Sequence, residues 1–141
     1  MDRKVVSNEI LLEDAAALME EGREVSLTPL GFSMLPFIRG GKDSVRMKKK
    51  ETVVPGDILL VRLPGPRYVL HRLIRKEGEK LTLMGDGNLQ GTESCTQADV
   101  LGTVTAIERG RWEIIPGTGG WWRRLPYIVR RIALGIIRRI I

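Results

Sequence analysis

The chain has 141 residues, a length typical of one domain with its own hydrophobic core. Hydrophobic residues make up 43% and charged residues 28%, a balance that excludes a disordered or fibrous chain. The single cysteine, Cys95, and the single histidine, His71, exclude an internal disulfide framework and a metal site built from cysteine or histidine clusters. We therefore expect no metal, no cofactor and no disulfide-linked partner.

The net charge of +6 is concentrated at the C-terminal end of the chain. Trp121 to Ile141 contains six arginines and no acidic residue. Removing these six from the 23 basic residues leaves 17, which equals the number of acidic residues. A nucleic-acid-binding protein usually spreads its basic groups over a face of the fold, so nucleic acid is not the expected partner. A basic segment that is also rich in isoleucine and tryptophan favours an anionic membrane surface.

The N-terminal residues do not have the pattern of a secretory signal peptide, because Glu9, Glu13 and Asp14 interrupt the first apolar stretch. No uncharged apolar run reaches the roughly 18 residues that a membrane-spanning helix needs. The expected location is therefore cytoplasmic or peripheral to a membrane.

The first expected element is a helix from Ser7 to Glu21. Ser7 or Asn8 can cap its N-terminus, and Gly22 can end it. Apolar residues at helical spacing define the face that it buries. They are Leu11, Ala15, Leu18 and Met19.

Seven short runs of β-like residues follow, separated by turns rich in glycine and proline. They are Val25–Thr28, Ser44–Met47, Asp57–Arg62, Tyr68–Ile74, Lys80–Met84, Val100–Glu108 and Trp112–Ile115. Short strands at this spacing predict a mainly β protein, a small barrel or paired sheets, and not a parallel α/β sheet.

A glycine-rich stretch, Pro116–Gly120, precedes a tail from Trp121 to Ile141. The tail predicts an amphipathic helix that lies on a membrane surface or packs on its own domain or a partner. Its apolar face contains Leu125, Ile128, Val129, Ile132, Ile136 and Ile140. We expect an N-terminal helix over 1–24, a β domain over 25–116 and the glycine-rich join and tail over 117–141. The join predicts that the β domain folds without the tail.

Three short segments contain side chains of the types that act in catalysis. Ser33 lies in the segment GFSMLP, between Gly31 and Pro36, where a turn exposes its hydroxyl. His71 lies inside the apolar strand Tyr68–Ile74, where an imidazole needs a partner. Asp86 follows a strand in the segment MGDGN. A turn, a structural histidine and a hairpin would explain each alone, but together they are the residue types of an activated-serine hydrolase.

The chain resembles the signal peptidase I and LexA-like serine peptidase superfamily in five segments, which occur in the order found in that family. The matching segments are GFSMLP at 31–36, VPGDILLVR at 54–62, YVLHRLI at 68–74, LTLMGDGN at 81–88 and DVLGTVTAI at 99–107. The pair His71-Arg72 is closest to the type found in the endoplasmic reticulum and in archaea, which uses histidine where most bacterial members use lysine.

This resemblance implies a small barrel of coiled antiparallel sheets and a role for each site residue. Ser33 would be the nucleophile, His71 the general base and Asp86 the aspartate that orients the imidazole. Glu93 or Asp99 would supply a second acidic residue, and the backbone N–H of Ser33 would be one oxyanion donor. Met34 and Leu35 would either line the substrate groove or belong to the core. A lysine base, Lys48 or Lys80, would be indicated instead by activity that still rises steeply above pH 9.

The expected function is a serine endopeptidase that acts on a peptide or protein substrate, with Ser33 and His71 as a catalytic dyad. The alternative is a catalytically idle member of the same fold that binds or tethers a partner. The presence of Ser33, His71 and Asp86 together favours the enzyme.

Overall fold

The computed structural model describes residues 3–5, 9–29, 31, 33–65, 67–117 and 119–140. Ser7 and Asn8, the expected caps of the first helix, lie outside these residues, as does Phe32 of the serine segment.

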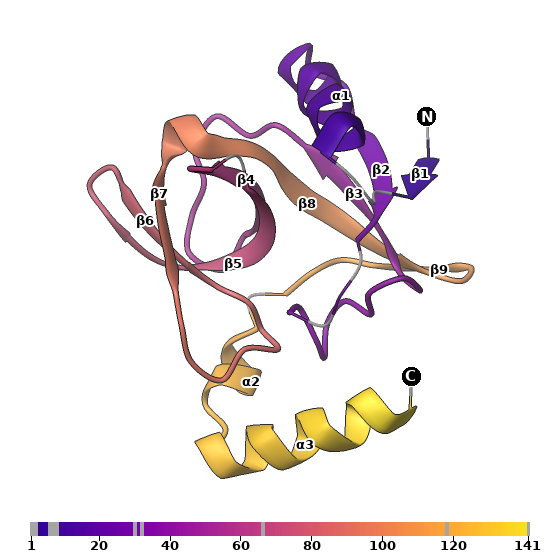
Figure 1. Cartoon of the computed structure of the whole chain (residues 1–141), viewed down its shortest axis with the longest axis vertical. Coiled ribbons are helices and arrows are strands. Elements are labelled where there is room, and N and C mark those ends of the chain that lie inside the picture. The colour runs from indigo at the N-terminus through magenta and orange to yellow at the C-terminus, as the bar shows by residue number, and fades with distance from the viewer. Residues whose placement is uncertain are drawn as a thin grey trace.

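The chain is mainly β, with a helix near each end, as the sequence predicts (Figure 1). All seven predicted strands are present within a few residues of their predicted bounds. Two strands that the sequence did not predict, β1 and β7, add to them. The elements are β1 (Arg3–Val5), α1 (Glu9–Glu20), β2 (Val25–Thr28), β3 (Ser44–Lys48), β4 (Ile58–Leu63), β5 (Arg67–Glu77), β6 (Lys80–Met84), β7 (Glu93–Thr96), η1 (Gln97–Asp99), β8 (Val100–Arg109), β9 (Trp112–Ile114), α2 (Gly120–Arg123) and α3 (Tyr127–Ile140).

The strands form one strongly coiled sheet in the order β1-β2-β3-β8-β4-β5-β6-β7, with β9 paired to β8. The pairings are antiparallel except for β1 with β2, which is parallel. Within the described residues, the outermost strands β1 and β7 do not pair with each other, so the sheet is open and not a closed barrel.

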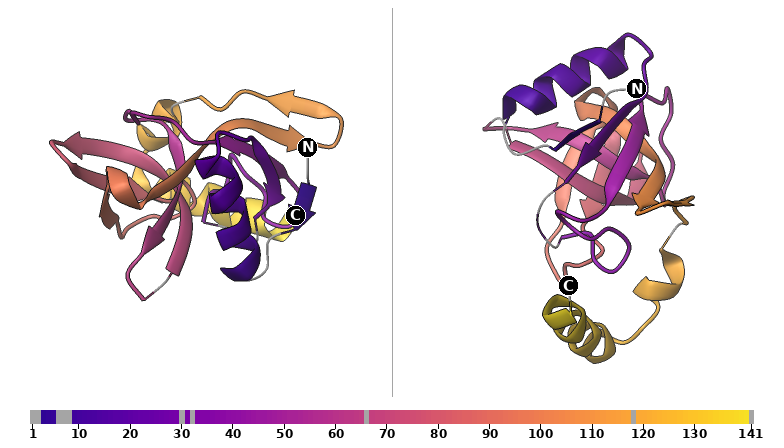
Figure 2. Two further views of the ribbon diagram at one scale, coloured as in Figure 1. Left: turned by 90° about the horizontal axis from the view of Figure 1, so that it is seen from above. Right: turned by 90° about the vertical axis from the view of Figure 1, so that its right-hand side faces the viewer.

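Helix α1 covers the sheet over β2 and β8 and closes the main core (Figure 2). A Cβ at Gly102 would lie 2.3 Å from the sulfur of Met19, so this glycine lets the helix pack directly on β8. The helix ends at Glu20, one residue before its predicted end, and Gly22 adopts φ +85° just beyond it. The N–H groups of Gly22 and Arg23 donate to the carbonyls of Met19 and Leu18, which satisfies the last turn of the helix.

A second core lies on the other face of β5. Val69 and Leu73 pack into this second core, whereas Tyr68 and Leu70 pack against the main core. The side chains of this strand therefore alternate between the two cores, which puts His71 on the same face as Val69 and Leu73. The second core contains Val53, Leu59, Val61, Leu63, Leu73, Leu81, Leu83, Cys95 and Val100.

The tail forms two helices, α2 and α3, and α3 begins just after Pro126. Trp122 and Leu134 are buried against Leu35 of the body. The tail therefore packs on the β domain through these residues. No helix in the described part of the chain is long and apolar enough to cross a membrane.

Candidate active site

Ser33 lies in a loop between β2 and β3 that closes on itself. The N–H of Gly41 donates to the carbonyl of Pro29 over 2.7 Å. A Cβ at Gly40 would lie only 1.8 Å from the carbonyl oxygen of Gly31, so two backbone segments touch at the neck of the loop. Only glycine permits so close an approach.

Asp43 anchors the end of this loop. Its fully buried carboxylate accepts hydrogen bonds from the backbone N–H and the guanidinium of Arg39 and from the guanidinium of Arg109. Burial by itself would raise the pKa of Asp43, but the hydrogen bonds from the two arginines outweigh it and hold the pKa below its ordinary value. The ionised carboxylate fixes the loop against β8.

The loop that follows β6 packs directly on Ser33. The N–H of Gly87 donates to the carbonyl of Ser33 over 2.8 Å, and the N–H of Asp86 faces the sulfur of Met34 at 3.5 Å. A Cβ at Gly85 would lie 2.3 Å from the same Ser33 carbonyl, so a side chain here would push the two loops apart. The structure therefore brings the predicted serine and aspartate segments together.

His71 is buried in the middle of β5, opposite Leu59 of β4. Its Nδ1 has no hydrogen-bond partner within the described part of the chain. Burial lowers the pKa of His71, and the charge of Arg67 lowers it further, while the charges of Glu93 and Asp86 act in the opposite direction. The net shift is downward, so the imidazole is neutral at pH 7 and able to accept a proton.

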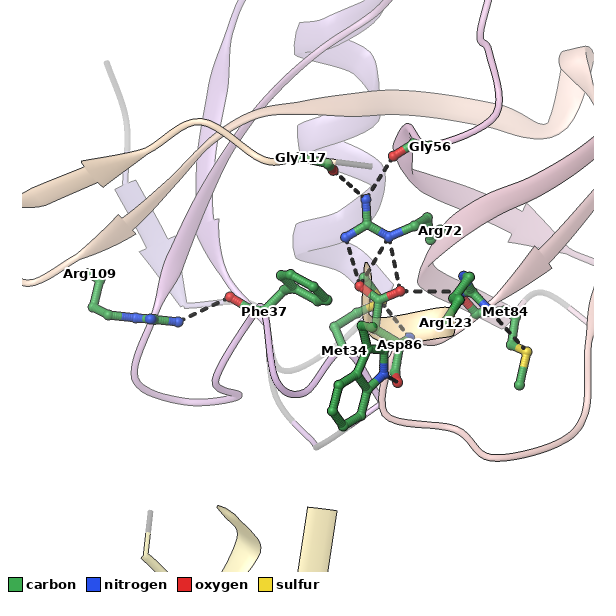
Figure 3. Close-up of polar contacts among 10 residues, drawn as sticks. Met34, Phe37, Gly56, Arg72, Met84, Asp86, Arg109, Gly117 and Arg123 are labelled. Atoms are coloured by element: carbon green, nitrogen blue, oxygen red, sulfur yellow. Dashed lines mark hydrogen bonds and ion pairs between the residues drawn. The ribbon is translucent and has the colours of Figure 1, made fainter. Parts of the chain in front are cut away.

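Asp86 binds Arg72 (Figure 3), and among the described residues no hydrogen bond joins it to His71. The Arg72 Nε–Asp86 Oδ1 distance is 2.9 Å and the Nη2–Oδ2 distance is 2.8 Å, and both side chains are almost completely buried. Since neighbouring side chains of a strand point to opposite faces, Arg72 draws this carboxylate to the face of β5 opposite His71. Asp86 acts on His71 through its charge and not through a hydrogen bond.

The glycine-rich stretch is a strap over Arg72 (Figure 3). Arg72 Nη1 donates to the carbonyls of Gly56 and Gly117, over 2.8 and 2.6 Å. Gly119 adopts φ +73°, and a Cβ there would lie 2.8 Å from Arg72 Nε. Gly119 therefore permits close packing on a buried guanidinium, a role that its sequence alone did not indicate.

The first turn of the tail completes this cluster. Trp122 Nε1 donates to the backbone carbonyl of Asp86 over 2.7 Å, and Arg123 lies 3.4 Å from its carboxylate. Arg72 also stacks on Phe37, with its guanidinium carbon 5.1 Å from the ring centroid. The Asp86 loop is thus held by the strand before it and by the tail.

Of the two acidic residues left open by the sequence, Glu93 is the one near His71. Its charge raises the pKa of His71, and the charge of His71 in turn acts on Glu93. Arg67 donates to Glu93 from Nη1 and Nη2, over 3.2 and 3.0 Å, and holds the pKa of Glu93 below the ordinary value. Asp99 instead accepts the N–H of Thr96 and caps η1.

Other candidates from the sequence take structural or surface positions. Met34 lies in the main core and Leu35 packs with Trp122. Both are therefore core residues and do not line a substrate groove. Lys48 and Lys80 are exposed. Neither lysine has the buried environment that a lysine general base needs.

A pocket of about 340 Å³ lies beneath the strap and not at the predicted dyad. Its lining includes Phe37, Arg72, Arg109 and Trp121. Neither Ser33 nor His71 lines it, so the candidate chemistry does not depend on it.

The structure thus brings the Ser33 loop, the strand of His71 and the Asp86 loop into one region. It contains no hydrogen bond between Ser33 and His71 in the described part of the chain. No known protein-family model matches the chain, and no curated protein matches it in sequence.

Proposed function

We propose that the protein is a serine endopeptidase that cuts a peptide bond through an acyl-enzyme on Ser33. The observation that carries the proposal is the docking of the Asp86 loop on the backbone of Ser33, beside the strand that holds the only histidine. The resemblance to the signal peptidase and LexA-like peptidases assigns the same three segments to the active site.

In the proposed reaction, the Ser33 hydroxyl attacks the carbonyl carbon of the substrate while His71 accepts the hydroxyl proton. The imidazolium then gives this proton to the nitrogen of the departing amine as the peptide bond breaks. Water, deprotonated by His71, hydrolyses the resulting ester and restores Ser33. The backbone N–H of Ser33 is the proposed donor to the oxyanion.

The electrostatics of the region support this role for His71. A lowered pKa keeps the base unprotonated at neutral pH, and the charges of Glu93 and Asp86 stabilise the imidazolium that forms in the transition state. The absence of a Ser33–His71 hydrogen bond is compatible with this proposal, because catalytic hydrogen bonds are often long before substrate binds.

The test is a mixed peptide library incubated with the parent protein and analysed by mass spectrometry. Ser33→Ala and His71→Ala should each reduce cleavage at least about a thousandfold, since both act in the same step. Ser94→Ala, a serine exposed on β7, is the matched control and should cleave like the parent. The absence of any Ser33-dependent cleavage would favour the idle binding module.

Asp86 is a poor probe of the chemistry because it also supports the fold. Asp86→Asn would leave the Arg72 guanidinium buried without its carboxylate, which we expect to lower the free energy of unfolding by about 3–5 kcal/mol. Glu93→Gln breaks a more exposed pair and should cost less than about 1 kcal/mol. Reduced cleavage by folded Glu93→Gln would therefore report on His71.

A further inference from the structure

Helix α3 has two apolar faces, of which only one is covered by the protein. Its inner face packs with Leu35 and Leu89, residues of the two loops that hold Ser33 and Asp86. Its outer face presents Ile128, Ile132 and Ile136, spaced four residues apart and exposed by 62, 59 and 54%. Figures 1 and 2 both show the outer side of α3 turned away from the rest of the molecule.

Basic residues accompany this outer row. Arg131 and Arg139 are exposed, and Arg139 lies three residues after Ile136, so it continues the same face. No acidic side chain occurs after Glu113, so no Asp or Glu of the tail pairs with these arginines.

The positive charge of α3 distinguishes between the two partners that could cover its outer face, a second copy of the chain and a lipid bilayer. A second copy of the chain would set one arginine-rich helix against another, which is unfavourable. The phosphates of an anionic bilayer complement guanidinium groups, which bind them with two hydrogen bonds. An apolar row bordered by arginines suits a helix lying in the plane of the lipid headgroups.

We propose that α3 binds an anionic lipid bilayer, with Ile128, Ile132 and Ile136 inserted among the headgroups. The inner face of the same helix packs on the Ser33 and Asp86 loops, so a bound protein holds these loops next to the lipid surface.

The experiment is sedimentation of the full chain with vesicles of phosphatidylglycerol and phosphatidylcholine, or of phosphatidylcholine alone. We expect binding to the anionic vesicles only, and weaker binding at high salt. Arg131→Gln with Arg139→Gln should weaken binding about thirtyfold, because each arginine near an anionic surface contributes roughly fivefold. Ile132→Gln with Ile136→Gln should weaken it at least about tenfold.

Each double variant has a matched control elsewhere on the surface. Arg62→Gln with Arg111→Gln removes the same charge from two exposed arginines of the body, and Val54→Gln with Ile115→Gln changes two exposed apolar residues. Both controls should bind within about twofold of the parent. Equal losses in controls and α3 variants, or no binding by the parent, would overturn the proposal.

Sedimentation velocity measures whether the outer face of α3 instead joins two copies of the chain. A parent dimer that Ile132→Gln with Ile136→Gln converts to monomer would identify the face as a contact between copies and overturn the membrane proposal. Ser33→Ala should bind vesicles like the parent. Vesicle binding without Ser33-dependent cleavage would contradict only the proposed function, and cleavage without vesicle binding would contradict only this inference.

Discussion

At the scale of single residues, the ionisation of His71 links the site to its surroundings. Burial favours the neutral imidazole, and only the charges of Glu93 and Asp86 work against it. The lowered pKa also has a consequence for stability. Between the folded pKa and the ordinary value of 6.5, the unfolded chain binds more protons than the folded one. The contribution of His71 to stability is therefore complete above about pH 6.5 and is lost as pH falls through the folded pKa.

We predict that His71 titrates below pH 6.5 in the folded protein. Because it is the only histidine, its Cε1–H proton gives one signal in that region of the spectrum, which NMR can follow without any substrate. Glu93→Gln should move the midpoint further down, because it removes a charge that stabilises the imidazolium. Arg67→Gln should move it up, because it removes an opposing charge.

Asp99→Asn is the control for this titration, since Asp99 contacts Thr96 and has no part in the pKa shift of His71. Its midpoint should match that of the parent. A parent midpoint at or above pH 6.5, or the same midpoint in Glu93→Gln, would contradict the electrostatic description of the site.

At the scale of elements, the strap over Arg72 depends on glycine for two separate reasons. Gly119 has a positive φ and also lies against the guanidinium, so a side chain would be strained and would collide. Gly119→Ala should therefore reduce the free energy of unfolding by about 2–4 kcal/mol, measured by urea denaturation, where backbone strain alone costs about 1–2.

Two other glycines separate these effects. Gly78 has φ +58° with open space around its Cα, so Gly78→Ala should show the backbone strain alone. Gly135 lies in α3 with nothing near it, and alanine there should stabilise the helix by roughly 0.5–1 kcal/mol. Equal losses for Gly119→Ala and Gly78→Ala would mean that the strap does not pack tightly on Arg72.

The strands differ in how well the sequence predicted them. β2 and β6 have the predicted bounds because glycine or a charged residue flanks an alternating apolar pattern. β7 was missed because Cys95 is its only buried residue, and its extended backbone comes from pairing with β6. β1 was missed because three residues become a strand only through their partner β2. Strand pairing of this kind is non-local and leaves little local pattern.

The candidate site was predictable in its segments and not in its hydrogen bonds. Ser33, His71 and Asp86 were identifiable by residue type and spacing, and the segments of Ser33 and Asp86 contact each other. His71 and Arg72 are neighbours on β5 and point to opposite faces of it. The hydrogen-bond partner of Asp86 depends on which of these two faces its carboxylate lies against. A fully buried arginine requires a carboxylate more strongly than a histidine does, which explains why Arg72 holds it.

At the scale of the whole molecule, the tail has an exposed outer side and buried residues that pack on the β domain. Trp122 is 3% exposed and its indole N–H satisfies the carbonyl of Asp86, while Leu134 covers Leu35. We therefore expect the independently stable unit to extend through α2, beyond the glycine-rich join.

We predict that two truncations separate these roles. Removing 127–141 uncovers Leu35 and should cost about 2–3 kcal/mol, an amount typical of one exposed apolar side chain. Removing 121–141 also deletes Trp122 and Arg123, and should cost a further 3–5 kcal/mol or so, which unfolds a domain of ordinary stability. Urea denaturation followed by far-UV circular dichroism measures both.

The adjacent tryptophans provide a matched pair that tests the same idea without truncation. Trp121 is 62% exposed, so Trp121→Ala should cost less than about 1 kcal/mol, whereas Trp122→Ala should cost about 3–5. The second variant leaves a cavity and removes the donor to the carbonyl of Asp86, which lies in the loop that contacts Ser33. Trp122→Ala should consequently reduce any Ser33-dependent cleavage even where it remains folded. If both tryptophan variants were equally stable, and the chain without 121–141 unfolded at the parent's urea concentration, the tail would not be part of the structural unit.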